Sequence, residues 1–373
     1  MISISVIIVN YNAKYFLKNC LDSVLSSDMI EQVEIIVVDN NSSDGSSEML
    51  HKEFPQVICL QNSENAGFSR ANNRGVAIAK GDYILILNPD TVISETTLSE
   101  MLHFSKSQSD FGAAGVQFMD GSGKFLPESK RNFPNLKVAG AKLLGYSKYY
   151  YANHIQKETT EKIDILTGAF MFIKRSVYQE VGGFDEDFFM YGEDIDLSYR
   201  ITKAGYHNHY VGSCKVLHFK GESTIKDKFY LTNFYGALSI FYKKHFPNNK
   251  ALYMLIDALI NAIISIKSIS APGASKAKEK FDSWVYLGDD DQFFEKLKLR
   301  FDASKGFKRR AIEDEIKEVE IIFFDSSFIS YQDIIKSISN PLIQKVKKRI
   351  ICRDHSFYLG SDASDERGEV VDL

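Results

Sequence analysis

Carboxylates and aromatic residues alternate in one short stretch near the middle of the chain. Six acidic side chains fall within twelve residues there: Asp185, Glu186, Asp187, Glu193, Asp194 and Asp196. The run Phe-Phe-Met-Tyr at 188–191 separates them, and a carboxylate beside such an apolar wall can have its pKa raised toward the range that suits a general base. The alternative is a solvated helix start, because Glu193 and Asp194 also fall in the expected first turn of a helix.

Three sets of polar residues follow directly after apolar, β-branched runs. Strands expected at 4–9, 33–38 and 83–87 end at Asn10-Tyr11, Asp39 and Asn88-Pro89-Asp90. The helical patterns between these runs predict βαβ units and a parallel sheet, in which ligands bind outside the carboxyl ends of the strands. The three sets together therefore predict a nucleotide site, although each one alone could be a plain cap or turn.

Composition and motifs argue against several other classes of protein. The formal net charge of −4 disfavours general nucleic-acid binding, and neither GxGxxG nor GxxxxGK[ST] occurs. The cysteines are widely spaced without a CxxC pair, as expected for free thiols in a reducing compartment: Cys20, Cys59, Cys214 and Cys352. No run reaches the roughly 18 apolar residues of a membrane span, and the N-terminus has the pattern of a strand, so we expect a cytoplasmic protein.

Eight motifs, taken together, resemble the inverting family 2 glycosyltransferases with the GT-A fold, in the subgroup that includes bacterial rhamnosyltransferases. They are VIIVNYN (6–12), EIIVVDNNSSDGS (34–46), NAGFSRANNRG (65–75), GDYILILNPDT (81–91), GAFM (168–171), GGFDEDFF (182–189), GEDIDL (192–197) and HFKGES (218–223). Each motif is weak alone, but together they follow the order of the family across residues 3–224. The resemblance implies an α/β fold with a Rossmann-like mixed sheet that binds a nucleotide-diphospho-sugar.

The resemblance also implies roles for the residues at the strand ends. Asn10 and Tyr11 would contact the nucleotide, and Asp39 would accept a hydrogen bond from a pyrimidine base. Asn65 and Arg70 would lie along the nucleotide and the diphosphate. These five residues are expected to form the donor-binding side of the site.

Asn88 and Asp90 stand where the family places its DxD motif. Asp90 would bind Mg²⁺ or Mn²⁺ with His218 as a second ligand, since hard oxygen ligands suit these cations. Asn88 departs from the pattern and removes one negative charge beside the metal. A histidine in an apolar run is otherwise more often a core residue, so the role of His218 depends on the resemblance.

The acidic stretch would supply the catalytic groups. Asp194 would be the general base that takes the proton from the acceptor hydroxyl, with Glu193 beside it, and Gly168 would border the acceptor. The QxxRW motif of processive polysaccharide synthases is absent near 197–201. We therefore expect one sugar to be added per encounter, with inversion.

The chain is expected to divide into a GT-A catalytic domain (1–228), a helical extension (229–285) and a small α/β appendage (286–373). An amphipathic pattern at 252–266 predicts a helix that either lies on the inner membrane surface as a peripheral contact or packs against the catalytic domain or a dimer partner. Residues 275–317 are rich in charge and are expected to be helical. We expect the appendage to be a docking or oligomerisation module.

The sequence leaves two functions to distinguish. The first is a glycosyltransferase that moves one sugar, rhamnosyl or another hexosyl, from a nucleotide-diphosphate donor to a saccharide or lipid-linked saccharide acceptor in bacterial surface polysaccharide assembly. The alternative is a catalytically inactive sugar-nucleotide-binding scaffold subunit of a polysaccharide assembly complex. The presence of Asp90, Asp194 and His218 argues for the enzyme, and Asn88 argues mildly for the scaffold.

Overall fold

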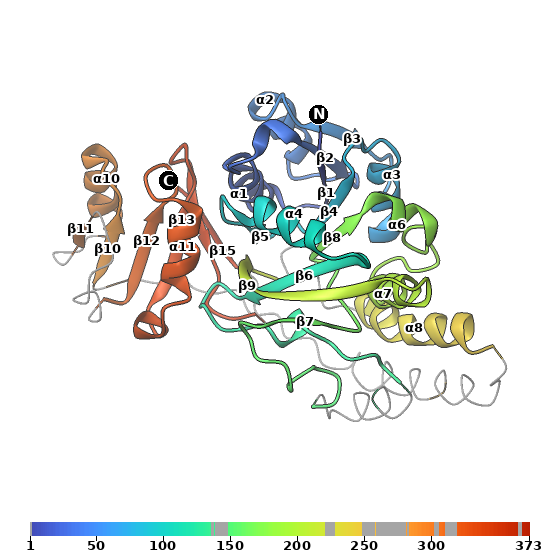
Figure 1. Cartoon of the computed structure of the whole chain (residues 1–373). Helices are drawn as coiled ribbons and strands as arrows, with labels where there is room; N and C mark the ends of the chain where they lie inside the picture. The colour runs from blue at the N-terminus through green and yellow to red at the C-terminus, as the bar shows by residue number, and fades with distance from the viewer. Residues whose placement is uncertain are drawn as a thin grey trace.

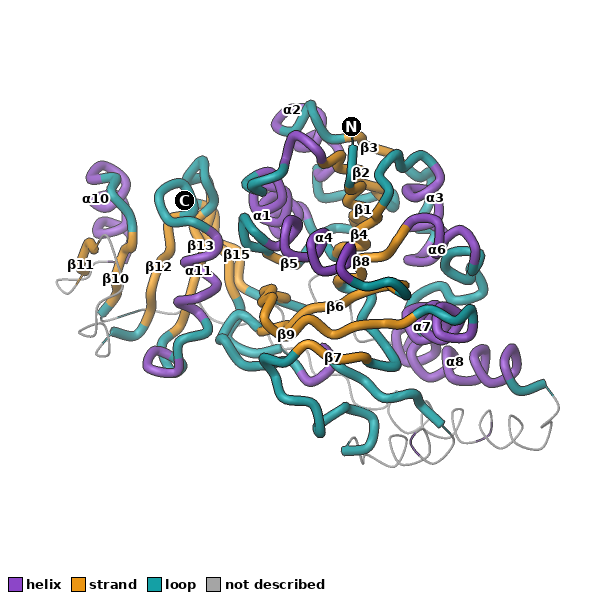
Figure 2. Tube along the Cα trace, viewed as in Figure 1, coloured by secondary structure: helices purple, strands orange, loops and turns teal. Residues whose placement is uncertain are grey.

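In the computed structural model, the described residues are 2–135, 148–220, 228–247, 283–301, 306–309, 319–364 and 368–373, with the single residues 138, 258 and 281. They form two sheets with helices packed on them (Figures 1 and 2). The first sheet belongs to residues 4–218 and the second to residues 284–372. The expected α/β fold class is confirmed.

The first sheet has nine strands over the described residues. They are β1 (Ile4–Asn10), β2 (Val33–Asp39), β3 (Ile58–Gln61), β4 (Tyr83–Leu87), β5 (Thr91–Val92), β6 (Phe111–Met119), β7 (Thr160–Lys162), β8 (Phe170–Lys174) and β9 (His207–His218). Their order is β3-β2-β1-β4-β8-β6-β9-β5, and β7 pairs with β9. Strands β1 to β4 are parallel, whereas β8 is antiparallel to β4 and β6, so the sheet is mixed as expected.

Helices cover both faces of this sheet, which is why its strands are continuous apolar runs. One face carries α1 (Lys14–Leu25), α2 (Ser46–Glu53) and α4 (Thr97–Ser107); the other carries α3 (Gly67–Ala77), α6 (Arg175–Glu180) and α7 (Glu193–Lys203). A longer helix, α8 (Lys228–His245), lies beside α7 (Figure 1). The carboxyl ends of β1, β2 and β4 therefore open at one edge of a sheet that is otherwise covered.

The second sheet combines a parallel part with an antiparallel edge. Its order is β11-β10-β12-β13-β14-β15, and the first four strands are mutually parallel. Its strands are β10 (Trp284–Leu287), β11 (Gly306–Arg309), β12 (Ile321–Asp325), β13 (Lys347–Ile351), β14 (Phe357–Gly360) and β15 (Glu369–Asp372). Helix α11 (Tyr331–Ile338) and helix α10 (Asp291–Phe301) pack on opposite faces. We call residues 283–373 the C-terminal unit.

Some expectations for the last third of the chain need correction. Residues 275–317 are not helical throughout, because β10 and β11 lie on either side of α10 in the described part. Each strand is only four residues long, which is too short to show a periodicity. The expected amphipathic helix at 252–266 lies outside the described residues, apart from residue 258. The division into domains at 228 and 285 stays a prediction.

In the described part of the chain, no helix combines the length and the apolar character that a bilayer span requires.

Candidate active site

Two of the expected nucleotide-binding residues lie side by side at the ends of β1 and β2. Asn10 and Asp39 are opposite each other in the parallel register, and Asn10 Nδ2 donates to Asp39 Oδ1 at 2.8 Å. Asn10 Nδ2 also donates to Ser42 Oγ at 3.0 Å, and the Ser42 amide donates to Asp39 Oδ2. Both side chains are fully buried, whereas Tyr11 is 37% exposed. The strand ends thus carry a buried, hydrogen-bonded pair of polar side chains, with the accessible ring of Tyr11 beside it.

Asp90 and His218 meet at the ends of β5 and β9. Thr91 pairs with His218 in the antiparallel ladder, and the Phe219 amide donates to the Asp90 carbonyl at 3.0 Å. His218 Nε2 lies 3.4 Å from Asp90 Oδ1, and both side chains are buried. Neither Asp90 Oδ1 nor His218 Nδ1 has a hydrogen-bond partner in the structure.

These two side chains fit a divalent cation. The buried Asp90 Oδ1 has no hydrogen bond and is costly to desolvate, and a cation bound to this oxygen would compensate for that cost. Among the described residues, no group of three or more His, Cys, Asp or Glu side chains could hold a metal ion. A site with so few protein ligands suits Mg²⁺ or Mn²⁺, which take further ligands from water and substrate phosphates.

Asp194 lies in the first turn of α7, and both of its carboxylate oxygens accept hydrogen bonds. Its Oδ2 accepts from Arg131 Nη2 at 2.6 Å and from the Gly168 amide at 3.1 Å, while its Oδ1 accepts from the Ile195 amide at 2.8 Å. Arg131 is buried and also donates to the Leu166 carbonyl. Asp194 is thus one half of a buried ion pair, which fixes the position of its carboxylate.

Glu193 has the opposite environment although it is the neighbouring residue. It is buried, and its Oε2 has no hydrogen-bond partner. Burial, together with the negative charge of Asp194, raises the pKa of Glu193 well above its usual range. The two adjacent carboxyl groups therefore have opposite surroundings: Asp194 is ion-paired with Arg131, whereas Glu193 is buried and has a raised pKa.

Residues 167–169 connect the Asp90–His218 pair to the Asp194–Arg131 pair. The Gly168 amide binds Asp194, and the Asn88 amide donates to the Ala169 carbonyl at 3.0 Å. Thr167 Oγ1 donates to the Glu128 carbonyl, and the Glu128 carboxylate pairs with Lys220 at 2.6 Å, two residues after His218. Both pairs therefore lie at one continuous region of the sheet edge.

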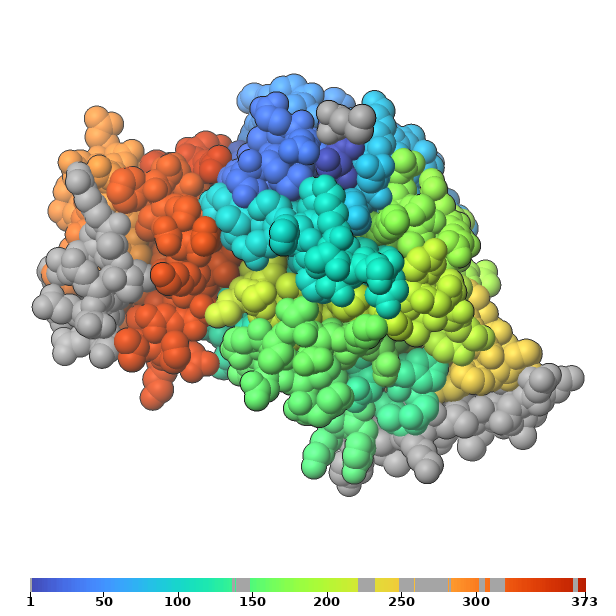
Figure 3. All heavy atoms as spheres, in the orientation of Figure 1, coloured from blue at the N-terminus to red at the C-terminus, as the bar shows by residue number. Residues whose placement is uncertain are grey.

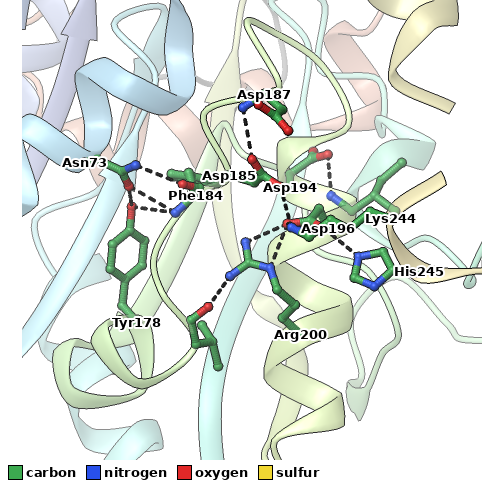
Figure 4. Close-up of polar contacts among 12 residues, drawn as sticks. Asn73, Tyr178, Phe184, Asp185, Asp187, Asp194, Asp196, Arg200, Lys244 and His245 are labelled. Atoms are coloured by element: carbon green, nitrogen blue, oxygen red, sulfur yellow. Dashed lines mark hydrogen bonds and ion pairs between the residues drawn. The ribbon is translucent and has the colours of Figure 1, made fainter. Parts of the chain in front are cut away.

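A buried carboxylate on α7 holds two neighbouring segments in place (Figure 4). They are α8 and the loop between α6 and α7, residues 181–192, which we call the acidic loop. Asp196 is completely buried and pairs with Arg200 at 2.6 Å and with His245 at 2.6 Å. Lys244 bridges Asp196 and Asp185. On the other side of the loop, Asn73 Nδ2 of α3 donates to the Phe184 carbonyl at 2.8 Å. Figure 4 shows the loop pinned between these two anchors.

The structure does not bring Asn65 and Arg70 into contact with the other predicted residues. Asn65 Oδ1 accepts from the Gly67 amide at the start of α3. Arg70 is exposed and pairs with Glu186 of the acidic loop at 3.2 Å. Their roles along the donor stay predictions.

Arg131 and Glu128 are site residues that the sequence analysis did not single out. They belong to the irregular region 124–160, which carries no motif and is rich in basic residues. Nothing in its spacing distinguishes Arg131 from the nearby Lys130. Only the folded chain shows that Arg131 reaches Asp194 across 63 positions of sequence.

Comparison with known proteins identifies the family. The profile described as "Glycosyl transferase family 2" matches residues 5–182. An N-acetylglucosaminyl-diphospho-decaprenol L-rhamnosyltransferase of Mycobacterium tuberculosis is 31% identical over 240 residues, which are 60% of this chain and 78% of the relative. The chain belongs to glycosyl transferase family 2. A second relative of this family 2 glycosyltransferase is rhamnosyltransferase WbbL of Escherichia coli, 31% identical over 57% of this chain and 82% of WbbL.

Among solved structures, this glycosyltransferase is similar to a mannosyltransferase from Pyrobaculum calidifontis in complex with GDP-Man and Mn²⁺. That similarity has a TM-score of 0.47 and 17% sequence identity, and it covers 72% of each chain. By sequence, this family 2 glycosyltransferase is rhamnosyltransferase-like.

Proposed function

We propose that this glycosyltransferase moves one sugar, rhamnosyl in the first instance, from a nucleotide-diphosphate donor to a saccharide or lipid-linked saccharide acceptor, with inversion, in bacterial surface polysaccharide assembly. The names of its mycobacterial and Escherichia coli relatives support a rhamnosyl donor. The decaprenol-linked substrate in the mycobacterial name supports a lipid-linked acceptor. We place the reaction on the cytoplasmic side, at the inner face of the cell membrane.

One observation carries this proposal: residues 167–169 contact both Asp194 and the segment that carries Asp90. Asp90 and His218 would provide the ligands for a cation, and Asp194 would provide a carboxylate held by Arg131. The Gly168 amide donates to the Asp194 carboxylate, and the Ala169 carbonyl accepts from the Asn88 amide, two residues before Asp90. A transferase needs these two elements on opposite sides of the reacting sugar carbon, one for the leaving diphosphate and one for the attacking hydroxyl.

The residues of the chain would divide the work as follows. Asp194 accepts the proton from the acceptor hydroxyl as the hydroxyl attacks the anomeric carbon on the side opposite the diphosphate. Arg131 and the Gly168 amide hold that carboxylate in one orientation, so little reorganisation is needed when the proton moves. Burial raises the pKa of Glu193, so its surroundings oppose a second negative charge beside Asp194. Attack from one side with departure from the other inverts the configuration.

The opposite end of the site would serve the diphosphate. Asp90 and His218 would hold Mg²⁺ or Mn²⁺, which stabilises the charge that develops on the leaving nucleoside diphosphate. Asn10, Asp39 and Tyr11 would bind the nucleotide at the ends of β1 and β2. Asn88 contributes an amide where a second carboxylate would stand, so we expect weaker metal binding than a full DxD motif gives.

The experiment is donor turnover across a panel of nucleotide sugars that includes dTDP-rhamnose, with Mg²⁺, Mn²⁺ or EDTA. Release of nucleoside diphosphate from one donor, abolished by EDTA, together with a product of inverted anomeric configuration by NMR, would support the proposal. Binding of a donor without any release, in the presence of lipid-linked saccharide acceptors, would instead favour the inactive scaffold subunit. A product that keeps the donor configuration would overturn the assignment of Asp194.

A further inference from the structure

The C-terminal unit shares one hydrophobic cluster with the catalytic domain. Its members come from both parts of the chain: Phe16, Val92, Met119, Leu217 and Phe219 from the first sheet region, and Tyr331, Ile335, Ile338, Leu287 and Phe324 among those from the second. Figure 3 shows the C-terminal residues, in orange and red, directly against the blue and cyan part of the chain. The contact is therefore a continuation of the protein core.

The catalytic half of this cluster lies on the strands that carry the proposed metal ligands. Val92 follows Asp90 by two positions, and Leu217 and Phe219 flank His218. Successive side chains of a strand point to opposite faces, so His218 faces Asp90 while its two neighbours face the C-terminal unit. The β5–β9 ladder thus has the cation site on one side and the C-terminal unit on the other.

A carboxylate from the same segment fastens the C-terminal unit from the polar side. Glu95 Oε1 accepts from the Tyr331 amide at 2.7 Å, and its Oε2 accepts from the Gln332 amide at 2.8 Å. These amides lie in the first turn of α11 and have no acceptor within the helix. The helix dipole also favours a negative charge at this end. Because Glu95 lies only five positions after Asp90, it ties this helix to the loop that follows the metal-binding turn.

Further contacts fix the orientation of the two parts. Lys348 Nζ donates to the Ser122 carbonyl at 3.1 Å, and Lys18 pairs with Asp354 at 3.2 Å. At Gly121, an added Cβ would lie 2.5 Å from the Ser361 carbonyl oxygen, so the backbones of the two parts are in close contact there. The interface has both apolar and polar attachments and leaves the β5–β9 ladder little freedom to shift.

We propose that the C-terminal unit is a positioning element of the cation site: through Ile338 and the Glu95 cap of α11, it supports the β5–β9 ladder and so fixes Asp90 and His218 relative to each other. This inference rests on the proposed function, because it takes Asp90 and His218 as the cation ligands. It assigns to residues far from the donor a specific effect on metal affinity. Supporting contacts behind a metal ligand commonly change metal affinity about 10–100-fold when they are removed.

Two pairs of variants separate positioning from general stability. Ile338→Ala removes packing at the shared cluster, whereas Ile351→Ala makes the same truncation at a buried position on the other face of the second sheet. Glu95→Ala removes the carboxylate that binds the Tyr331 and Gln332 amides of α11, whereas Glu31→Ala removes an exposed carboxylate elsewhere in the catalytic domain. Glu95→Ala leaves the hydrophobic cores intact and so remains informative if Ile338→Ala does not fold.

The measurement is the affinity of the full chain for Mn²⁺ in the absence of donor. Binding is detected as a decrease in the electron paramagnetic resonance signal of free Mn²⁺. Amide hydrogen exchange of a peptide covering 216–219 is recorded in parallel. We expect Ile338→Ala and Glu95→Ala to raise the Mn²⁺ dissociation constant about tenfold and to speed exchange in that peptide. Ile351→Ala and Glu31→Ala should bind Mn²⁺ as the wild type does.

Asp90→Asn is the reference variant that separates a failure of the metal assignment from a failure of the positioning role. If wild-type Mn²⁺ binding does not depend on Asp90, the metal assignment in the proposed function fails, and the inference fails with it. If binding depends on Asp90 but Ile338→Ala and Glu95→Ala bind Mn²⁺ like the wild type, only the positioning role is overturned. Equal weakening by Ile351→Ala and Ile338→Ala would also overturn it, since general destabilisation would then explain the effect.

Discussion

At the level of single residues, the chemistry depends on the different surroundings of two adjacent carboxyl groups, Glu193 and Asp194. Asp194 is paired with Arg131 and bound to two backbone amides, whereas Glu193 is buried with an oxygen that has no partner. The first arrangement stabilises a charge and the second opposes one. The site therefore places one ion-paired carboxylate next to one buried carboxyl group whose pKa is raised.

Arg131 should be essential for catalysis because it fixes Asp194. We expect Arg131→Lys, which keeps the charge but loses the planar fork, to lower kcat about 100-fold while the dissociation constant of the nucleotide stays near the wild-type value. Steady-state kinetics with isothermal titration of the nucleotide would test this. Lys203→Ala, on the exposed face of α7, serves as the control and should leave both quantities unchanged. A variant with normal kcat would remove Arg131 from the site.

Glu193→Gln should make the protein more stable in a defined range of pH. Burial and the charge of Asp194 raise the pKa of Glu193 to about 8, so the folded state keeps the proton that the unfolded state loses above its ordinary value of 4.5. Wild-type stability therefore falls as the pH rises from 4.5 toward 8, and the glutamine variant avoids that loss. Melting temperatures from pH 4 to 9 should coincide at the acid end and diverge up to about pH 8. Parallel curves would show that Glu193 is ionised in the folded protein.

Residue types and spacing foretold part of this site. Asp90 and His218 could be expected to meet, because the motifs around them follow the family order, and the structure brings them to 3.4 Å. Arg131 could not be expected, because a buried ion pair between residues 63 positions apart leaves no periodic signal. The contrast between Glu193 and Asp194 was equally hidden, since it arises from burial and partners and not from their chemical type.

At the scale of elements, α8 is joined to the catalytic helix α7 through a buried charge. Asp196 accepts from His245 and pairs with Arg200 and Lys244. Burial alone would raise the pKa of Asp196, but the hydrogen bond from His245 and the charge of Arg200 outweigh it, so the pKa lies below its usual value. This network stabilises the fold above the unfolded pKa of an aspartate and is lost as the pH falls through the folded pKa.

His245→Ala should therefore destabilise the protein by about 1–3 kcal/mol at pH 7, because it removes a donor from a fully buried carboxylate. Chemical denaturation would measure the free energy of unfolding, with His103→Ala on an exposed face of α4 as the control. The difference between His245→Ala and the wild type should shrink in acid, where Asp196 becomes protonated in both. A loss equal to that of His103→Ala would show that the contact carries no stability.

Sequence patterns predicted the first elements better than the later ones. The parallel strands β1, β2 and β4 are buried on both faces and therefore read as continuous apolar runs. Strand β9 begins with His207, Asn208 and His209, so only its last residues could be anticipated as an apolar run. In the C-terminal unit, β10 and β11 are four residues each, and the charged segment around them was wrongly expected to be helical.

At the scale of the whole molecule, two sheets share a hydrophobic cluster at the back of the proposed cation site. The appendage that the sequence suggested as a docking module is packed onto the catalytic domain along β5 and β9. Periodicity within each segment could not reveal this, because the cluster is assembled from residues as distant as Phe16 and Leu359. The arrangement makes the geometry of Asp90 and His218 a property of the entire chain.

Single-turnover kinetics of Asp194→Asn test whether Asp194 is the base of the sugar transfer. The variant keeps the size of the side chain, so donor affinity should stay at the wild-type level. The rate of transfer from the preferred nucleotide sugar should fall by about 10²–10⁴-fold, the contribution of a well-placed base. If a folded, donor-binding Asp194→Asn variant transfers the sugar at the wild-type rate, Asp194 is not the base.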